Sequence, residues 1–533
     1  MGGGLMQLVA YGAQDVYLTS NPQITFWKVT YRRHTNFAME AIEQTFNGQA
    51  DFGRRVTCTI SRNGDLAYRT YLQLTLPEIG QSEAAYARWL DFPGHQLVSQ
   101  VEIEIGGQRI DRQYGDWMHI WNSLTQSKEQ EVGYHNMVGQ TTALTYITDP
   151  TFAEIDTPCS SDAPRQTCAP RKALPETTLY VPLQFWYCRN PGLALPLIAL
   201  QYHEVKINID LRPIDECLWA TDDIACASGN SGKSTSGAYS QSLVAASLYV
   251  DYIFLDTDER RRMAQNPHEY LIEQLQFTGD ESVGSSSNKI KLNFNHPCKE
   301  LIWVVQPDRN VDYCASLDCA ADLFKLLGAQ PFNYTDAYDA LPNAFHAFGA
   351  ATALADGMVT ASGFFGNADA DQLGATALAE AGDGFGGSGL QSGPSTEADG
   401  GSLVSDAGTF VLAETALNMH CWGQNPVVTA KLQLNGQDRF SEREGTYFDQ
   451  VQPFQHHTRA PDAGINVYSF ALRPEEHQPS GTCNMSRIDN ATLQLVLSNA
   501  TVEGTATAKV RIYAVNYNVL RIMSGMGGLA YSN

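Results

Sequence analysis

Apolar and polar residues alternate along short stretches of this chain, and a tight turn often follows them. In Val101–Ile105 apolar side chains occupy every second position, and Gly106 and Gly107 come directly afterwards. Alternation of this kind predicts a strand with one buried face, because successive side chains of a strand point to opposite sides. A Gly-Gly pair is typical of a hairpin turn. The stretch is therefore expected to be a half-buried strand that enters a hairpin.

The same pattern returns in the second half of the chain. Ala430–Leu434 alternates in the same way and is followed by Asn435 and Gly436. Segment 179–209 matches segment 467–497 at a constant spacing of 288 positions. Val250–Leu255 matches Val510–Val515, which lies 260 positions later. Internal repetition on this scale predicts two copies of one structural unit.

The spacing between matching segments changes along the chain, and insertions account for the changes. The second half gains a long segment between about 329 and 408, and the first half gains length around 134–178 and 220–242. Insertions accumulate in surface loops, because a core strand cannot absorb them. Each half is therefore expected to be one β-domain with long loops at one end.

Many short alternating segments and few helical ones predict an all-β fold. One short helix is indicated by Trp117, Ile120, Trp121 and Leu124, which are spaced i, i+3, i+4, i+7. Ser316 is expected to cap a second short helix. About eight strands in each half favour two tandem eight-stranded jelly rolls with long loop insertions. The pattern alone does not separate a jelly roll from other Greek-key sandwiches.

Three segments divide the chain. Residues 1–30 have no counterpart in the second half, so they are expected to form an arm outside both barrels. Residues 31–262 should form the first jelly roll and residues 263–533 the second, with a boundary in the charged stretch Asp256–Pro267. The alternative for the first segment is a core strand, since Ile24–Tyr31 alternates acceptably.

The charge of the chain argues against nucleic-acid binding. Its 533 residues carry a formal net charge of −23, and a protein that neutralises phosphates needs clustered Lys and Arg. No Lys or Arg occurs between Lys325 and Lys431, where eleven acidic residues lie. This acidic, Gly- and Ala-rich stretch, about 329–408, is expected to face solvent as the crown of the second barrel.

The cysteines and histidines indicate no metal site. Eleven cysteines are spread through the chain without a C-x-x-C pair, so buried free thiols are expected. Pairing of Cys159 with Cys168, or of Cys314 with Cys319, is the alternative. His456 and His457 are adjacent, and as strand residues they would point to opposite faces and could not share a metal.

No pattern of catalytic residues or of a bound cofactor is found. Gly232-Lys233-Ser234 resembles the end of a phosphate-binding loop, but the first glycine of that motif is replaced by Ala227. No G-x-S-x-G motif occurs. Glu102 and Glu104 are expected on a solvated strand face and not in acid–base catalysis. The chain is therefore not expected to be an enzyme.

Four Asn-x-Ser/Thr sequences are candidate glycosylation sites. They begin at Asn333, Asn484, Asn490 and Asn499. About three such sequences are expected by chance in a chain of this composition, so the signal is weak.

Three ordered motifs resemble one family. They are the amino-terminal block Leu8–Asn36, the segment Ile60–Leu66 and the carboxyl-terminal Gly525–Tyr531. Together they closely resemble the corresponding parts of the major capsid proteins of nucleocytoplasmic large DNA viruses. Because the motifs lie at both ends and in order, the resemblance covers essentially the whole chain.

The resemblance implies a structural tile. In this family two jelly rolls stand side by side in one chain, and three chains form a pseudo-hexagonal capsomer of an icosahedral shell. The implied partners are two further copies of the chain, neighbouring capsomers, minor capsid and penton proteins, and an inner viral membrane. The implied location is the virion, with assembly in the host cytoplasm. The arm is then expected along the inner face of the capsid.

A glycan-binding or adhesive β-sandwich protein is the alternative. Jelly rolls also serve lectins, and Phe364 and Phe365 in the acidic loop could stack on sugars. A lectin would not need the aromatic amino-terminal block.

Overall fold

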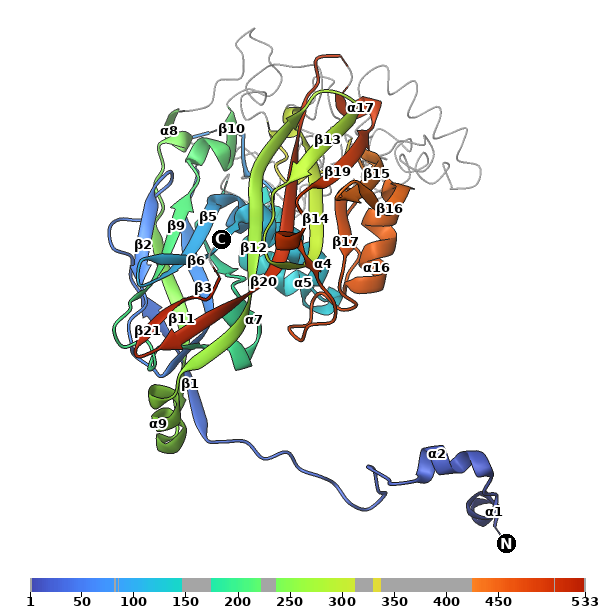
Figure 1. The fold of residues 1–533 in the computed structure, drawn as a ribbon. Coiled ribbons are helices and arrows are strands. Elements are labelled where there is room, and N and C mark those ends of the chain that lie inside the picture. Colours follow the sequence, from blue (N-terminus) through green and yellow to red (C-terminus); the bar gives the residue numbers. More distant parts are fainter. Residues whose placement is uncertain are drawn as a thin grey trace, which may run out of the picture.

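The computed structural model describes residues 2–80, 83–84, 86–145, 174–221, 236–311, 329–336, 424–502 and 504–531. Two β-barrels stand side by side, the first drawn from blue to green and the second from yellow-green to red (Figure 1). The helix predicted after Ser316, the phosphate-loop-like segment and nearly all of the acidic insertion lie outside the described residues.

The first barrel consists of two sheets of four main strands each, which face each other. One sheet has the order β1-β11-β3-β7 and the other β2-β9-β5-β6. The strands are β1 Phe37–Gln44, β2 Arg55–Thr59, β3 Leu66–Leu76, β5 Val98–Ile105, β6 Gln108–Tyr114, β7 Thr177–Pro182, β9 Val205–Leu211 and β11 Ala245–Leu255. Short β8 (Leu195–Pro196) pairs with β3, and β4 (Tyr86–Trp89) pairs with β10 (Leu218–Thr221).

The second barrel repeats this arrangement. Its sheets have the orders β12-β20-β14-β17 and β13-β19-β15-β16. The strands are β12 His268–Val283, β13 Ser287–Leu292, β14 Pro297–Pro307, β15 Val427–Leu434, β16 Gln437–Glu444, β17 Ile465–Ser469, β19 Ala491–Leu497 and β20 Ala508–Met523. Two short strands are added, β18 (Cys483–Asn484) beside β14 and β21 (Met526–Leu529) beside β20.

Counted within its own half, each barrel has the strand orders 1-8-3-6 and 2-7-4-5, which is the jelly-roll topology. Val101–Ile105 and Ala430–Leu434 occupy the same place, the fourth strand of each barrel. Their alternating residues behave as predicted, with Val101, Ile103 and Ile105 in one core and Ala430 and Leu432 in the other. The all-β, double jelly-roll fold predicted from the sequence is confirmed.

The helices are short and lie between strands. The main ones are α3 Pro93–Leu97, α4 Gly115–Thr125, α5 Glu131–Val138, α7 Trp186–Arg189, α9 Thr257–Gln265 and α16 Gln452–His456, which continues the π-helix η11 Tyr447–Val451. The others are α1 Gly3–Val9, η1 Ala13–Asp15, α2 Val16–Thr19, η2 Lys128–Gln130, α6 Thr142–Thr145, η4 Pro191–Leu193, η5 Ile214–Glu216, α8 Ser236–Tyr239, η6 Asp308–Val311, η12 Met485–Arg487 and α17 Asn499–Val502. Helix α4 appears where the four-residue apolar spacing predicted it, and α9 lies in the stretch predicted to join the halves.

The two barrels share core residues at their lower end. Ile272 of β12 and Leu520 and Ile522 of β20 belong to the apolar core of the first barrel. Figure 1 shows β12 and β20 running from the second barrel down to the first, where β21 lies. The backbone N–H of Tyr202 in the first barrel donates to the carbonyl of Gly525, 3.0 Å away. A side chain at Gly527 would meet Leu200 at 2.7 Å, which explains the glycines of the carboxyl-terminal motif.

A glycine follows the fifth strand of each barrel at the point where the chain turns into a helix. A Cβ atom at Gly115 would overlap the backbone carbonyls of His95 and Val98. A Cβ atom at Gly445 would overlap the carbonyl of Val427, which corresponds to Val98 in the duplicated barrel. Only glycine lets the chain pass so close to the first residue of the fourth strand.

We expect Gly115→Ala to lower the free energy of unfolding by about 1–3 kcal/mol, because rigid backbone stands where the methyl group would lie. Gly133→Ala is the matched control, since a Cβ atom there meets nothing within 4 Å in helix α5. That substitution should be neutral or slightly stabilising. Chemical unfolding of both variants checks this, and equal losses at the two sites would argue against the close approach.

Candidate functional site: the seam between the barrels

Outside the two cores, a cluster of buried residues joins the barrels, and we call this contact the seam. It consists of α4 and β6 of the first barrel and of the sheet β12-β20-β14-β17 of the second. Helix α4 directs its predicted apolar face, from Trp117 to Leu124, onto that sheet. Its partners there are buried apolar residues of four segments: Ile302, Val304, Ile465, Val467, Tyr513, Val515 and Tyr334. Helix α4 thus acts as an apolar wedge between two barrels.

Beside the wedge, strand β6 lies against strand β12. The side-chain amide of Gln274 donates to the carbonyl of Ile110 at 2.5 Å, and the N–H of Leu275 donates to the Asp111 carboxylate at 3.1 Å. Burial raises the pKa of Asp111 to about 7, although the N–H of Leu275 and the charge of Arg189 favour its charged form. A cavity of about 200 Å³ opens next to this contact, lined in part by Arg109 and Phe277.

An ionic cluster crosses the seam at one end of α4. Arg511 of β20 contacts Asp116 of α4 at 2.6 Å and Asp280 of β12 at 3.0 Å. Arg212 of the first barrel contacts the second oxygen of Asp116 at 3.7 Å. Asp116 and Arg511 are both largely buried. Removal of either would leave its partner charged with little water to compensate.

A second ionic cluster crosses the seam around Glu273. Its carboxylate contacts Lys299 at 2.7 Å, Arg189 of the first barrel at 3.0 Å and His477 at 3.7 Å. Burial would raise the pKa of Glu273, but contacts with His477, Arg189 and Lys299 lower it to about 2. The carboxylate therefore stays charged under all ordinary conditions, and so does this link between the barrels.

A third contact between the barrels begins at the end of α16. The prediction that His456 and His457 are strand residues was wrong, because His456 ends helix α16 and His457 follows it. His457 is buried between Glu300 at 2.9 Å and Glu475 at 3.0 Å. Burial would lower its pKa, but the two carboxylates raise it to about 9. The cluster is held by charge, and no sequence-local pattern could reveal it because Glu300 is distant in the chain.

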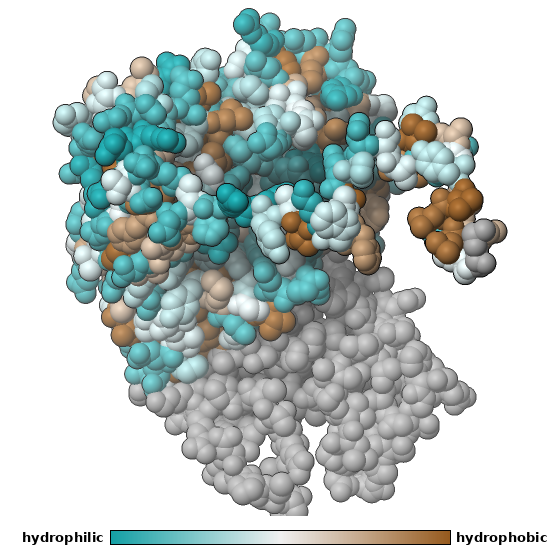
Figure 2. All heavy atoms as spheres, turned by 90° about the horizontal axis from the view of Figure 1, so that it is seen from below, coloured by the Kyte–Doolittle hydropathy of each residue, from teal (hydrophilic) through white to brown (hydrophobic). Residues whose placement is uncertain are grey.

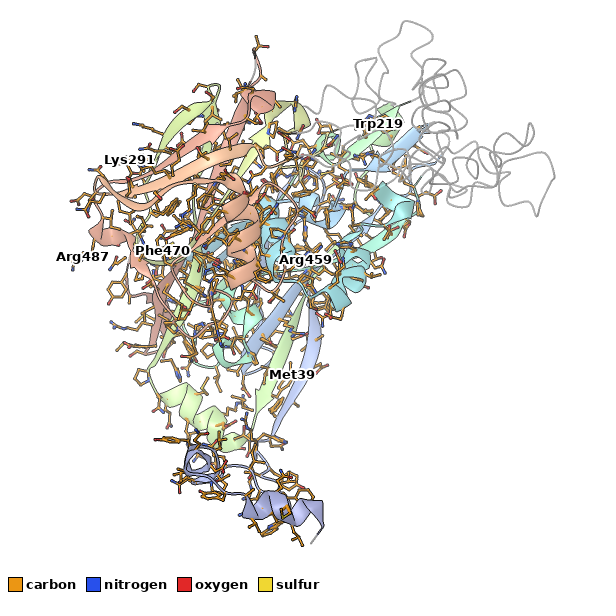
Figure 3. The ribbon with its side chains drawn as sticks, turned by 90° about the vertical axis from the view of Figure 1, so that its right-hand side faces the viewer. Met39, Trp219, Lys291, Arg459, Phe470 and Arg487 are labelled. Atoms are coloured by element: carbon orange, nitrogen blue, oxygen red, sulfur yellow. The ribbon has the colours of Figure 1, made fainter. Side chains whose placement is uncertain are left out.

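His457 positions the next residues against the first barrel. The backbone N–H of Arg459 donates to the carbonyl of Leu124 at 3.1 Å, and the Arg459 guanidinium contacts Glu131 of α5 at 2.6 Å. Figure 3 shows Arg459 between the α16 helix of the second barrel and the cyan helices of the first. The seam is therefore closed at several separate points around the apolar wedge.

The expectation of a solvated face at Glu102 was also wrong. Glu102 is only 3% exposed, and its side chain contacts Arg55 at 2.8 Å and Arg112 at 2.5 Å, with Arg109 at 3.6 Å. Burial would raise the pKa of Glu102, but Arg112 and Arg55 lower it. Arg55 comes from β2, beyond the strand that neighbours Glu102, so strand periodicity alone could not foresee the pairing.

Among the described residues, the surfaces that correspond to the seam in the duplicated barrels carry exposed or half-exposed side chains. The sheet β1-β11-β3-β7 presents a row of tyrosines outward, with Tyr71 stacked on Tyr249 at 5.4 Å and against Tyr180 at 6.3 Å. The segment η11–α16 occupies the place of α4 and exposes Phe454, while Leu472 is exposed close by. Strand β16, the counterpart of β6, is exposed along nearly its whole length.

An arm precedes the first barrel. All residues from 2 to 36 are exposed except Asp15, which is partly buried. Thirteen of them have large apolar side chains: Leu5, Met6, Leu8, Val9, Tyr11, Val16, Tyr17, Leu18, Ile24, Phe26, Trp27, Val29 and Tyr31. Only an isolated bridge, Thr25 to Lys28, interrupts its irregular part. Figure 2 shows the brown, hydrophobic end of the arm projecting beyond the body of the protein.

The predicted modification and thiol sites have clear positions. Asn484, Asn490 and Asn499 are exposed, whereas the Asn333 amide is engaged by Gln330 and Thr335. Cys58, Cys188, Cys217 and Cys298 are buried free thiols, as predicted, and Cys483 is partly buried and free. The other six cysteines, including both alternative pairs, lie outside the described residues.

Within the described ranges no group of three or more His, Cys, Asp or Glu is placed to hold a metal ion. Among the same residues, no helix is long and apolar enough to span a membrane.

Two jelly rolls side by side in one chain define the class of double jelly-roll capsid proteins, and solved structures share this fold. The chain in the quasi-atomic PBCV-1 virus capsid is 34% identical, with a TM-score of 0.61 over 96% of this chain and 100% of that one. The Faustovirus major capsid protein is 13% identical, with a TM-score of 0.60 over 98% of this chain and 96% of that one. At this low identity it supports the similarity of fold alone.

The sequence comparisons identify the family. A model described as "Major capsid protein N-terminus" matches residues 25–256, and one described as "Large eukaryotic DNA virus major capsid protein" matches residues 259–528. The major capsid protein of Phaeocystis pouchetii virus is 78% identical over 538 residues, with all of both chains covered. The chain therefore belongs to the large eukaryotic DNA virus major capsid protein family, a structural family of the virion capsid and not an enzyme family. The resemblance is confirmed, and the glycan-binding alternative finds no support.

We expect Arg511→Met to lower the free energy of unfolding by about 3 kcal/mol, because Asp116 loses its buried counter-charge. Arg521→Met on the same strand is the matched control. Its pair with Glu269 is half exposed on both sides and should contribute no more than about 1 kcal/mol. Urea unfolding of both variants checks the difference, and similar losses would contradict the structural role of the seam cluster.

Proposed function

We propose that three copies of this chain form a closed ring of six barrels, which is the capsomer of an icosahedral shell. The observation that supports this most strongly is the seam. It is a head-to-tail contact, because α4 and β6 of one barrel meet a different surface, the sheet β12-β20-β14-β17, on the next barrel. Head-to-tail contacts generate rings when the rotation between neighbours closes.

Each of the two surfaces that meet in the seam has a counterpart on the other barrel. The tyrosine row on β1-β11-β3-β7 corresponds to the sheet that receives α4. The segment η11–α16 corresponds to α4 and exposes Phe454, with Leu472 close by. A second copy can therefore dock its α16 side on the tyrosine row, and three such contacts alternate with three seams. Exposed apolar side chains that lie together are the expected mark of an interaction surface.

The duplication also explains a tile with nearly hexagonal outline. Six similar barrels around a three-fold axis can pack closely against neighbouring capsomers, and many weak contacts add up over a shell. We propose that minor capsid and penton proteins complete this shell in the virion, and that it assembles in the host cytoplasm.

We also propose that residues 1–30 form an arm at the inner face of the shell, ahead of barrels at 31–262 and 263–533. Its exposed apolar side chains need a partner to cover them, and it carries Lys28 against Asp15 only. Neighbouring capsomers, minor proteins and the underlying membrane are the partners that this surface fits. The acidic insertion at about 329–408 is proposed as the outer crown of the second barrel.

Glycans, if the capsid carries them at Asn-x-Ser/Thr, are proposed at Asn484, Asn490 or Asn499. Asn333 is a poorer acceptor, because its amide nitrogen donates to Gln330 at 2.7 Å and Thr335 is buried.

If the proposed ring forms, a charged side chain at Phe454 should prevent its assembly. Phe454→Asp should convert a trimer, of three times 58.5 kDa, into a folded monomer, because a carboxylate buried in an apolar contact costs several kcal/mol. Val132→Asp is the control, since Val132 is 70% exposed and lies outside both surfaces. Light scattering after size-exclusion chromatography measures the mass. A trimer that survives Phe454→Asp, or a wild-type monomer, would refute the docking mode.

The arm predicts a separation of folding from assembly. Deletion of residues 1–20 should leave a normal trimer that fails to form shells, because these residues contribute nothing to either core. Removal of Gly2–Gly4 alone is the control and should leave assembly intact. Electron microscopy of the assembly products, together with the trimer mass, checks both. An aggregated or unfolded product of the longer deletion would show that the segment belongs to the core.

A further inference from the structure

Three histidines gather at one end of the seam, and we call them the histidine cluster: His95, His119 and His135. They come from α3, α4 and α5. The rings of His95 and His119 are 5.9 Å apart, and His119 stacks on Phe332 of the second half at 4.4 Å. Phe92 lies 4.5 Å from His119 and 5.4 Å from His135. The cluster is thus an aromatic contact between the helices of the first barrel and segment 329–336.

The two inner histidines are buried without a counter-charge. His95 is fully buried, and its Nε2 contacts the Tyr134 hydroxyl at 2.7 Å. His119 is 5% exposed. The Nδ1 atoms of both rings have no hydrogen-bond partner among the described residues. An imidazolium needs such partners when water is excluded, so the site fits neutral rings only.

The charged groups that face the cluster do not favour protonation of its inner members. His95, His135 and Arg459 all disfavour a positive charge on His119. The carboxylates of Glu131 and Asp462 act on His135 at the rim, against Arg459 and Lys128. Burial, with His135, lowers the pKa of His95 to about 3, and burial lowers the pKa of His119 well below its usual range. His457 shows the opposite case, because Glu300 and Glu475 hold it charged.

We infer that the histidine cluster is an acid-sensitive latch, which releases α3–α5 from segment 329–336 and so loosens the seam when its rings take up protons. Helix α4 makes the coupling direct. It carries His119 together with the apolar wedge and with Asp116, the partner of Arg511. Displacement of α4 to hydrate His119 would open those contacts as well. This latch lies within one chain and does not depend on the proposed ring.

The sign of the effect follows from the two states. In the opened form the rings are hydrated and have a pKa near the ordinary value of about 6.5. In the closed form they stay neutral, so the closed form loses stability as the pH falls below about 6.5. Two such rings should raise the opening equilibrium constant by roughly 100-fold between pH 7.5 and pH 5.5. Above pH 7.5 the cluster should have no effect.

Hydrogen–deuterium exchange of the purified full-length protein, corrected for the intrinsic effect of pH, tests the latch. Peptides from α3–α5 and from 329–336 should lose protection at pH 5.5, while a peptide covering β9 should not. The double variant His95→Gln/His119→Phe should abolish this acid response. His34→Gln, which changes an exposed histidine of the arm, should leave it as in the wild type. An equal acid response in the double variant, or equal loss of protection in β9, would overturn the inference.

A second measurement needs no substitution and decides the matter if the double variant fails to fold. Exchange of the imidazole C2 proton in the wild-type protein, followed by mass spectrometry, gives the pKa of each histidine. Values for His95 and His119 well below the ordinary value of about 6.5 are expected. Values at or above about 6.5 would overturn the inference.

Discussion

The burial of the apolar face of α4 between two barrels is the contact on which the rest of this structure depends. A jelly roll can satisfy its own core, so two rolls on one chain have no intrinsic reason to hold a fixed angle. The apolar face of α4 fixes the angle, because its side chains can leave water only by packing on the second barrel. They are Trp117, Ile120, Trp121 and Leu124. The ionic clusters around the wedge then select one orientation, since each leaves a buried charge unpaired if the barrels rotate.

The duplication explains both the similarity of the barrels and their difference. The two halves keep the same strand order and the same glycine after the fifth strand, at Gly115 and Gly445. Yet helix α4 of the first barrel is buried against the second barrel of the same chain, whereas the corresponding segment of the second barrel leaves Phe454 exposed. The carboxyl terminus adds a further constraint: β21 extends β20 under the first barrel, and the barrels share Ile272, Leu520 and Ile522 in one core. A rigid pair of this kind suits a tile whose contacts with its neighbours must recur at fixed angles.

The sequence predicted most of the fold, because its signals are periodic or repeated. Alternation placed the strands, and the matching segments showed the duplication. The i, i+3, i+4, i+7 spacing of apolar residues placed α4, the helix that packs in the seam. It did not predict the polar contacts. Glu102 resembles a solvated residue until Arg55 is brought to it from another strand, and His457 resembles a strand residue until Glu300 and Glu475 surround it. Such pairings depend on tertiary proximity between residues far apart in the chain, and no local pattern encodes that proximity. The close approaches at Gly115 and Gly445 are in the same category, although their equivalent places in the two halves were a signal that could have been found.

We propose that the contact between the barrels of one chain is repeated, on the corresponding surfaces, between neighbouring chains. Electron microscopy of the purified protein at neutral pH tests this most directly. We expect particles with six lobes around a three-fold axis, in which the α16 side of each second barrel lies on the β1-β11-β3-β7 sheet of the next chain. A particle in which that sheet faces solvent, or one whose barrels meet through other surfaces, would contradict it.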